Sequence, residues 1–554
     1  MARNTGTGRK MAGILRLICL TAFISILAFP CFGDGNRQRI VPLDSEIYND
    51  IDTLYLIKGL TPPSYARPWS EDEIDMILSK LDPDHLEGAE KLAYDNIIKS
   101  FQKRILLGKE EQAGVAIKLK ANLEGYVKTD DDRDEWEHGY EERLPLVDIP
   151  FEFFLWNNFY IDFNLTLREA HDVVTDCDYD YCNVPEKIQN LDPTIPFRAF
   201  MSAGGNHWNV QFGRDKLSWG NGETGNLVLS DYSDFYNVIK FTTYWKVLKF
   251  TTIYAGMESH LTKEEKEIDK TDPGLTQGNY DNFRERYKAL MAHRLEARIT
   301  DKVSVAATEA IIFGNKYPEL SNINPVTIFH SVFAPECSNS LMSLEADYAP
   351  CRGLDIYAQF AMDECKLAIE SDSSRPTALG YMLGARYVMP VSTGFLTLKL
   401  EGAKTDPYLY NRWHPLTRYT NRRRYWSYIE DGYMYVDKPT GYEHGPDAMV
   451  FYLAGEYRIP DDLKLGAEVT MKFLGELNDS LSDPFSYNGA RNRISPTGDD
   501  VARELVIGLH GEKRLNRSFK VGADAYYINI DNYHNIGGKT INDFEIAAHV
   551  SYEL

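Results

Sequence analysis

The feature that most constrains the fold of this chain is an alternation of apolar and polar residues running from Val115 to the last residue, Leu554. About eighteen segments, each roughly 8–12 residues long, follow one another with a period of two, which is typical of β-strands with one apolar face. Leu396, Leu398 and Leu400, for example, alternate with polar residues, and the last segment repeats this pattern. The pattern predicts an all-β fold for most of the chain.

The connections between these segments alternate between short and long. The short ones are Asn157-Asn158, Gly204 to Asn206, Thr300 to Lys302, Ala349 to Arg352, Arg458 to Asp462 and Arg514 to Asn516. The long ones reach about forty residues, and this alternation is typical of transmembrane β-barrels, which have tight periplasmic turns and large outer loops. A soluble sandwich has no reason to sort its loops in this way. We therefore predict a closed antiparallel barrel of about 18 strands in the outer membrane.

The strand count has one alternative. The segments 196–203 and 207–213 are short, so 16 strands would result if they did not both span the barrel. The number should be even, because both ends of the barrel are expected on the same side.

The polar face of each strand must line the lumen, because a charge on the lipid face costs about 2–4 kcal/mol at the midplane. The inward-facing charged residues predicted in this way are Lys118, Lys120, Arg294, Glu296, Arg298, Lys399, Glu401 and Asp524. They would suit a water-filled pore, and they would equally suit a lumen that is cross-linked by ion pairs and blocked by inward loops.

Two segments precede the barrel. Residues 1–33 carry basic residues, an apolar stretch from Leu17 to Phe29 and small residues, the order of a secretory signal peptide cleaved after Gly33. Acylation of Cys31 is a weaker alternative, because Pro30 stands directly before it. Residues 34–110 read as helical, and residues 111–554 as the barrel.

The helical segment has clear boundary signals. Ser70 and Glu73 form a capping box before an apolar run, and Asp82-Pro83 ends that helix. An earlier helix should end at Gly59, and a third helix follows Pro83. We expect a three-helix bundle on the periplasmic side.

The cysteines of the mature chain fit this topology. Cys177 and Cys182 share one long loop, and oxidising compartments favour such local bridges. Cys337 and Cys365 flank a hairpin whose turn is near Cys351, so they should meet at its outer end. Cys351 lies at the opposite end, well beyond the roughly 7 Å that a disulfide can span between Cα atoms. We predict disulfides 177–182 and 337–365.

Composition and motifs exclude several functions. A net charge of −22 argues against nucleic acid as a partner. The sequence has no serine nucleophile elbow, no zinc-binding His-Glu-x-x-His and no phosphate loop, so we predict no enzyme activity and no metal or cofactor. His171-Asp172 in an outer loop leaves a surface hydrolase as a remote alternative, and the acidic stretches at 130–137 and 176–180 read as a hydrated rim rather than a calcium loop.

One outer-loop segment, residues 412–428, is basic and aromatic in an otherwise acidic chain. Aromatic faces stack on sugar rings, and arginine binds carboxylates in a bidentate manner. An aromatic girdle with lipid-headgroup contacts, including lipopolysaccharide phosphate, is the structural alternative. The candidate glycan-binding residues are Arg412, Trp413, Arg418, Tyr419, Arg422, Arg423, Arg424 and Trp426, with Trp219 added from a Gly-rich turn in which packing is the favoured role.

Several short motifs together resemble the Wzi-type family of capsule assembly proteins. They are Val41-Pro42-Leu43, Gly213-Arg214, Trp219 to Gly222, Leu227 with Leu229 and Ser230, Glu309, Asn324-Pro325 with His330, Asn339, Asp363-Glu364 and Gly445 to Asp447. The resemblance covers nearly all of the mature chain. It implies an eighteen-stranded outer-membrane barrel with a periplasmic helical bundle that attaches or organises capsular polysaccharide without catalysis.

These observations leave a ranked set of hypotheses. The first is a non-enzymatic, monomeric outer-membrane protein that binds surface polysaccharide and contacts outer-membrane lipid. A porin or substrate-specific channel is the alternative, and it depends on whether the lumen is open.

Overall fold

A computed structural model describes residues 37–101, 107–109, 113–156, 158–171, 181–192, 197–271, 284–332, 337–364, 376–412, 414–427, 431–478 and 493–554. The predicted signal peptide and its cleavage site lie outside these residues. Cys177 and Cys365 also lie outside them, so both predicted disulfides remain predictions. Among the described residues, no helix is long and apolar enough to cross a membrane.

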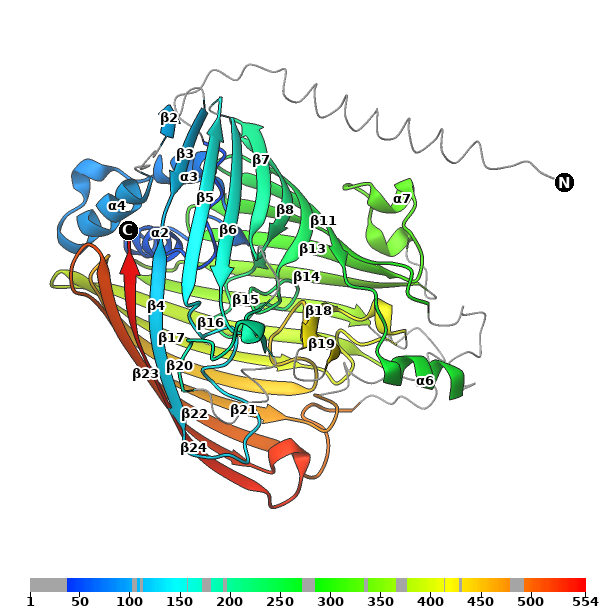
Figure 1. Cartoon of the computed structure of the whole chain (residues 1–554). Coiled ribbons are helices and arrows are strands. Elements are labelled where there is room, and N and C mark those ends of the chain that lie inside the picture. Colours follow the sequence, from blue (N-terminus) through cyan, green and yellow to red (C-terminus); the bar gives the residue numbers. More distant parts are fainter. Residues whose placement is uncertain are drawn as a thin grey trace.

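The described strands form a closed antiparallel barrel of 18 strands (Figure 1). Its first strand is interrupted into β3 (Ala113–Ile117) and β4 (Lys120–Lys128), and the short β2 (Leu107–Lys109) pairs with β3. The other barrel strands are β5 (Val147–Leu155), β6 (Phe159–Leu167), β7 (Ala199–Gly205), β8 (Trp208–Asp215), β10 (Tyr236–Tyr244), β11 (Leu248–Met257), β12 (Lys288–Thr300), β13 (Val303–Gly314), β14 (Ser338–Tyr348), β15 (Leu354–Glu364), β16 (Ala378–Val391), β17 (Gly394–Thr405), β20 (Ala448–Ile459), β21 (Leu463–Leu474), β22 (Ala502–Arg514), β23 (Phe519–Asp531) and β24 (Thr540–Glu553).

The barrel closes between its last and first strands. β24 pairs with β4 from Glu553 opposite Lys120 to Glu545 opposite Lys128. β7 and β8 pair along their length, so both short segments are barrel strands and the 16-strand alternative is wrong.

The two faces of the strands differ as the alternation predicted. On β17, Leu398 and Leu400 are 45% and 58% exposed on the outside, whereas Glu401 is buried inside. Other exposed apolar residues of this outer belt include Leu123, Phe212, Phe241, Leu295, Leu344, Leu383, Phe451, Leu465, Leu509, Phe544 and Val550. The belt faces lipid, and the polar face lines the lumen.

Charges in the lumen are paired with one another. Arg294 of β12 is almost fully buried and forms a bidentate pair with Glu345 of β14, with Nη2 3.0 Å from Oε2. Its Nε also lies 3.1 Å from Glu296. Of the predicted inward charges, Arg294 thus forms an ion pair with a carboxylate of another strand, whereas Lys399 pairs with Glu223 of a connection that enters the barrel.

The alternation of connections is confirmed. The six predicted short turns are found, and residues 245–247 and 392–393 form two more that the sequence analysis missed. The long connections join strand ends at the other end of the barrel, where Figure 1 shows α6 (Lys263–Thr271) and α7 (Leu320–Ile323); η3 (Phe329–Val332) and η6 (Tyr533–Asn535) belong to two of these connections. A further short helix, η2 (Ile188–Asn190), belongs to the connection between β6 and β7.

The N-terminal helices occupy the short-turn end of the barrel (Figure 1). They are α2 (Ile47–Ile57), α3 (Glu71–Leu78) and α4 (Gly88–Ser100), with the 3₁₀ turn η1 (Pro83–His85) between the last two. Gly59 follows α2 with φ +74°, which is the left-handed conformation expected of a helix stop. The Ser70 hydroxyl accepts a hydrogen bond from the Glu73 amide at 3.3 Å, as a helix cap does.

These helices are joined to the barrel wall by buried contacts. Val388 and Phe395 of the barrel belong to the same apolar core as the helices. Glu73 does not complete the capping box, because its carboxylate lies 2.5 Å from the Lys249 ammonium of β11. On α2, Asp50 is fully buried and pairs with Arg458 of β20.

The pair between Asp50 and Arg458 predicts a large effect on stability. Arg458→Met would leave the Asp50 carboxylate buried without its cation, at a cost of about 3–5 kcal/mol. Urea unfolding of the refolded barrel in detergent should show a lower midpoint. The double variant Asp50→Asn with Arg458→Met should recover most of the loss, and equal loss in both variants would contradict the role of this charge pair.

Candidate functional site

The Arg-aromatic segment lies in the long connection between β17 and β20. After the 3₁₀ turn η4 (Pro415–Thr417), the chain forms a hairpin of β18 (Thr420–Ser427) and β19 (Gly432–Pro439). The hairpin is separate from the barrel sheet and lies within the end that carries the long connections (Figure 1). Trp413 lies outside the described residues.

Beneath this hairpin, the connection between β8 and β10 crosses the lumen. It begins with β9 (Ser218–Trp219), which pairs with the N-terminal β1 (Ala66–Arg67). Gly220 follows with φ +123°, and a Cβ there would lie 2.2 Å from Asn226 Oδ1, so the position requires glycine. The Asn226 oxygen accepts hydrogen bonds from the Gly222 amide at 3.0 Å and from Gln359 of β15 at 2.8 Å.

Carboxylates attach this crossing loop to the opposite wall. Glu223 lies 2.9 Å from both Arg386 Nε of β16 and Lys399 Nζ of β17. Burial alone would raise the pKa of Glu223, but Arg386 and Lys399 outweigh burial and lower this pKa to about 2. Glu401 accepts hydrogen bonds from the amides of Glu223 and Thr224 at 2.7 and 2.9 Å.

Trp219 is part of this loop and is buried. Its side chain is 1% exposed and belongs to an apolar core with Leu227, Leu229 and Tyr410. In this conformation the indole cannot stack on a sugar ring. Packing, the role favoured for this residue from its Gly-rich surroundings, is what the structure shows.

Arg422 is held by two carboxylates. Its Nη1 and Nη2 lie 2.8 and 2.9 Å from the two carboxylate oxygens of Glu265 in α6, and its Nε lies 2.7 Å from Asp437 on β19. Burial alone would lower the pKa of Arg422, but these carboxylates raise it, and the guanidinium remains charged.

Arg423 is held in the same way on the other side of the hairpin. It forms an ion pair with Asp192, and its Nη1 donates to the Tyr140 hydroxyl at 2.9 Å. Its guanidinium also lies 5.2 Å from the Tyr140 ring centre, within the range of a cation–π contact. Arg422 and Arg423 are 9% and 8% exposed.

Three further candidates of the segment are buried, and one of them, Tyr419, joins the loop to the barrel. Arg412 and Arg418 are each 1% exposed, and Arg418 Nε donates to the Arg412 carbonyl at 3.3 Å. Tyr419 is fully buried, and its hydroxyl lies 2.8 Å from the Ala310 carbonyl of β13.

The candidate glycan-binding residues of this segment are therefore not all accessible at the outer rim. Arg412, Arg418, Tyr419, Arg422 and Arg423 are buried. For Arg422 and Arg423 the physical reason is that carboxylates of Glu265, Asp437 and Asp192 compensate the desolvation of the guanidinium groups.

Arg424 and Trp426 remain accessible, together with Tyr433 on the opposite strand. The Trp426 and Tyr433 side chains are 36% and 55% exposed, and their rings meet edge to face with centres 5.1 Å apart. Arg424 lies 4.6 Å from the Tyr433 ring centre and 28% of its side chain is exposed. These three residues form an accessible cationic and aromatic face, which we call the mouth triad.

The Arg424 guanidinium is oriented by two neighbours from the β11–β12 connection. Its Nη1 lies 2.7 Å from His260 Nε2, and its Nε lies 3.7 Å from Glu258. Because arginine only donates, His260 Nε2 accepts and Nδ1 donates to Glu258. Both carboxylate and ring therefore hold Arg424 at the surface of the hairpin.

The sequence analysis missed Tyr433, Glu258 and His260. Tyr433 and Tyr435 alternate after Gly432, which is a strand signal that could have identified the second half of the hairpin. Glu258 and His260 belong to a different connection, and His260 is 164 positions from Arg424 in the sequence. No pattern in the sequence near Glu258 or His260 indicates that they contact Arg424.

The remaining sequence candidates do not assemble into an active or metal site among the described residues. His171 lies between the rings of Tyr140 and Tyr425, and burial lowers its pKa to about 4. Asp172 and the acidic stretch 176–180 lie outside the described residues. In the stretch 130–137, the buried Arg133 pairs with Glu137 and with Glu545 of β24, and the described part of the chain has no cluster suited to a metal ion.

Comparison with known proteins now identifies the family. The family described as "Capsule assembly protein Wzi" matches residues 197–534, which is more than half of the chain. This chain belongs to the Wzi family of capsule assembly proteins. No curated protein sequence matches it significantly.

A solved structure supports the same fold. Wzi of Escherichia coli, described as an outer-membrane protein involved in group 1 capsule assembly and a carbohydrate-binding β-barrel, is 14% identical. The match covers 93% of this chain and 99% of that chain with a TM-score of 0.58, which establishes a shared fold. The Wzi-family chain thus has the same β-barrel fold.

Two other outer-membrane proteins also match over most of their length. Pseudomonas aeruginosa OprD is 10% identical, with coverage of 81% and 99% and a TM-score of 0.40. Vibrio cholerae OmpT is 10% identical, with coverage of 81% and 100% and a TM-score of 0.34. At these TM-scores, neither structure supports a conclusion about the fold or function of this Wzi-family protein.

The attachment of the crossing loop predicts a dependence on acid. The folded-state pKa of Glu223, about 2, is below its ordinary value of 4.5. Its contribution, on the order of 3 kcal/mol from the size of this shift, is therefore fully present above pH 4.5 and is lost as the pH falls toward about 2. Thermal unfolding can be followed by tryptophan fluorescence from neutral pH down to about pH 3. Over this range the melting temperature should fall more steeply for the native chain than for Glu223→Gln. The same slope for both would contradict this assignment.

Proposed function

We propose that this protein binds capsular polysaccharide at its outer mouth and holds it at the cell surface without chemical conversion. The mouth triad carries this proposal. Arg424, Trp426 and Tyr433 are accessible on a hairpin that is otherwise fixed by buried ion pairs. A rigid pair of aromatic rings can stack on sugar rings, and an adjacent guanidinium can bind a uronate carboxylate.

Family membership supports a role in capsule assembly, and the related protein from Escherichia coli is described as binding carbohydrate. In the orientation that we propose, the short-turn end with the three helices faces the periplasm, in keeping with the usual arrangement of outer-membrane barrels. The mouth triad then faces outward, where capsular polysaccharide lies.

The crossing loop argues against the channel alternative. Residues 216–235 span the lumen and are attached to strands on its far side through Glu223 and Glu401. The same loop is attached to the hairpin connection above it, since the Ser230 amide donates to the Thr440 carbonyl at 2.8 Å. Two layers of chain therefore lie across the path that a solute would take.

The position of His171 argues against the hydrolase alternative. A general base must reach the proton that it removes. His171 is packed between two tyrosine rings, with centres 5.0 Å from Tyr140 and 5.8 Å from Tyr425. We therefore propose a binding role without catalysis, by a monomer that carries its own site.

The mouth triad can be tested directly by polysaccharide binding. Trp426→Ala, Tyr433→Ala and Arg424→Gln should each weaken binding of an acidic capsular polysaccharide about tenfold, equivalent to ~1.4 kcal/mol. The loss in Arg424→Gln should shrink at high salt, because it removes a partly exposed charge. Immobilised purified protein and polysaccharides of defined composition provide the measurement.

Trp245→Ala is the matched control, since Trp245 is 48% exposed in a short turn at the opposite end. It should bind as the native chain does. In cells, the triad variants should shed more polysaccharide than this control. Unchanged binding and retention in all three triad variants would remove the glycan-binding proposal.

The filled lumen can be tested in planar bilayers. The native chain should give no large, stable conductance steps, whereas replacing both residues 220–229 and the hairpin residues 420–439 with short Gly-Ser linkers should produce them. Large openings in the native chain would favour the channel alternative.

A further inference from the structure

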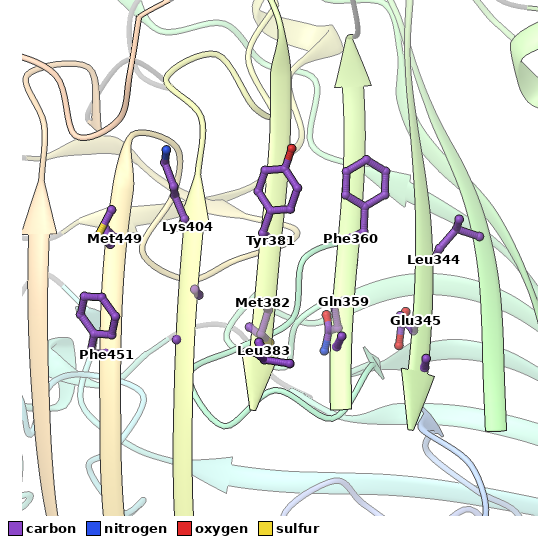
Figure 2. A pocket seen from close by; sticks show the side chains of 14 residues that line it. Leu344, Glu345, Gln359, Phe360, Tyr381, Met382, Leu383, Lys404, Met449 and Phe451 are labelled. Atoms are coloured by element: carbon purple, nitrogen blue, oxygen red, sulfur yellow. The ribbon is translucent and has the colours of Figure 1, made fainter. Parts of the chain in front are cut away.

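The lipid-facing side of the barrel carries a groove across β14, β15, β16, β17 and β20 (Figure 2). Its volume is about 610 Å³, and it is broadly open toward the lipid side. The side chains that wall it are large: Leu344, Tyr381, Leu383 and Phe451 are exposed, and Phe360 is half-buried.

The groove exists because small residues interrupt the outer belt. Gly402 lies in register between Leu383 of β16 and Phe451 of β20, which are 63% and 50% exposed. A Cβ at Gly402 would have Phe451 ring atoms, at 3.6 Å, as its nearest neighbours, so the backbone does not require glycine. Ala358, opposite Leu383 on the other side, widens the hollow.

One cation lies on this face at the end of the groove nearest the long connections. Lys404 is the penultimate residue of β17 and lies in register with Tyr381 and Met449. Figure 2 shows the Lys404 ammonium and the Tyr381 hydroxyl pointing toward the same end of the strands. Within the described part of the chain, Lys404 is in no ion pair, and Asp406, two residues further on, is the carboxylate close enough to feel its charge.

The surroundings determine what can occupy the groove. Its walls belong to the belt that contacts hydrocarbon, so the occupant is a lipid chain. A lysine at the end of a membrane strand extends its ammonium toward the headgroup layer. There it meets anionic phosphates, with which an ammonium forms charge-assisted hydrogen bonds.

We propose that this groove is a specific seat for a phosphorylated glycolipid of the outer leaflet, with one acyl chain along Gly402 and a phosphate on Lys404. The site would hold the barrel in a fixed relation to the surface lipid. It is distinct from the mouth triad and does not depend on polysaccharide binding.

The test uses the full-length mature protein in mild detergent, titrated with hexa-acylated bisphosphorylated lipid A and followed by native mass spectrometry. The native chain should retain one lipid A molecule in preference to the same lipid without its phosphates. Gly402→Leu fills the hollow and should lower the retained fraction about tenfold for both lipids. Lys404→Gln should reduce retention of the phosphorylated lipid severalfold and leave the dephosphorylated lipid unchanged.

Gly455→Leu is the matched control for the groove. Gly455 also faces outward on β20, and a Cβ there would have Leu398 as its nearest neighbour, at 3.6 Å. Lys302→Gln, in a short turn at the opposite end, controls for loss of one positive charge. Both should retain lipid A as the native chain does.

Equal retention by Gly402→Leu and Gly455→Leu would overturn the groove as the seat. An equal effect of Lys404→Gln on the two lipids would overturn the phosphate contact. Heat-modifiable gel mobility verifies that each variant is folded, and Gly402→Phe provides a second groove-filling variant if Gly402→Leu does not fold.

Discussion

The structure depends on one constraint, which is that hydrocarbon offers no hydrogen-bonding partner to the peptide backbone. A sheet in this environment must have no free edge, and the pairing of β24 with β4 removes the last one. Once the sheet is closed, one face of every strand meets lipid and the other faces an enclosed lumen, which explains the strict alternation along each strand.

The enclosed lumen creates a second requirement, since charges placed there need partners. Arg294 is neutralised by Glu345 of a nearby strand, but other charged residues are paired with segments that enter the barrel. Asp50 of α2 reaches Arg458, and Glu223 of the crossing loop reaches Arg386 and Lys399. The helices and loops that fill the barrel are therefore held by the charges of its wall, and breaking one partner leaves the other buried and uncompensated.

The same logic separates the arginines of the hairpin into two groups. Arg422 and Arg423 are surrounded by carboxylates from α6, β19 and the β6–β7 connection and stabilise the hairpin. Arg424 points to the same face of the strand as Arg422 but emerges beside two exposed rings. An uninterrupted run of three arginines thus has two structural residues and one that is accessible to a ligand.

The sequence by itself determined the closed barrel, the sorting of short and long connections, the end at which the helices lie and the burial of charges such as Glu401. These properties follow from local periodicity, which reports which face of a strand meets an apolar solvent. Only the tertiary structure decided which members of the Arg-aromatic segment are accessible. The burial of Arg423 depends on Asp192, 231 positions away, and that of Trp219 on a strand near the N-terminus. Pairings between distant connections leave no periodic signal, so no single stretch of the chain could reveal them.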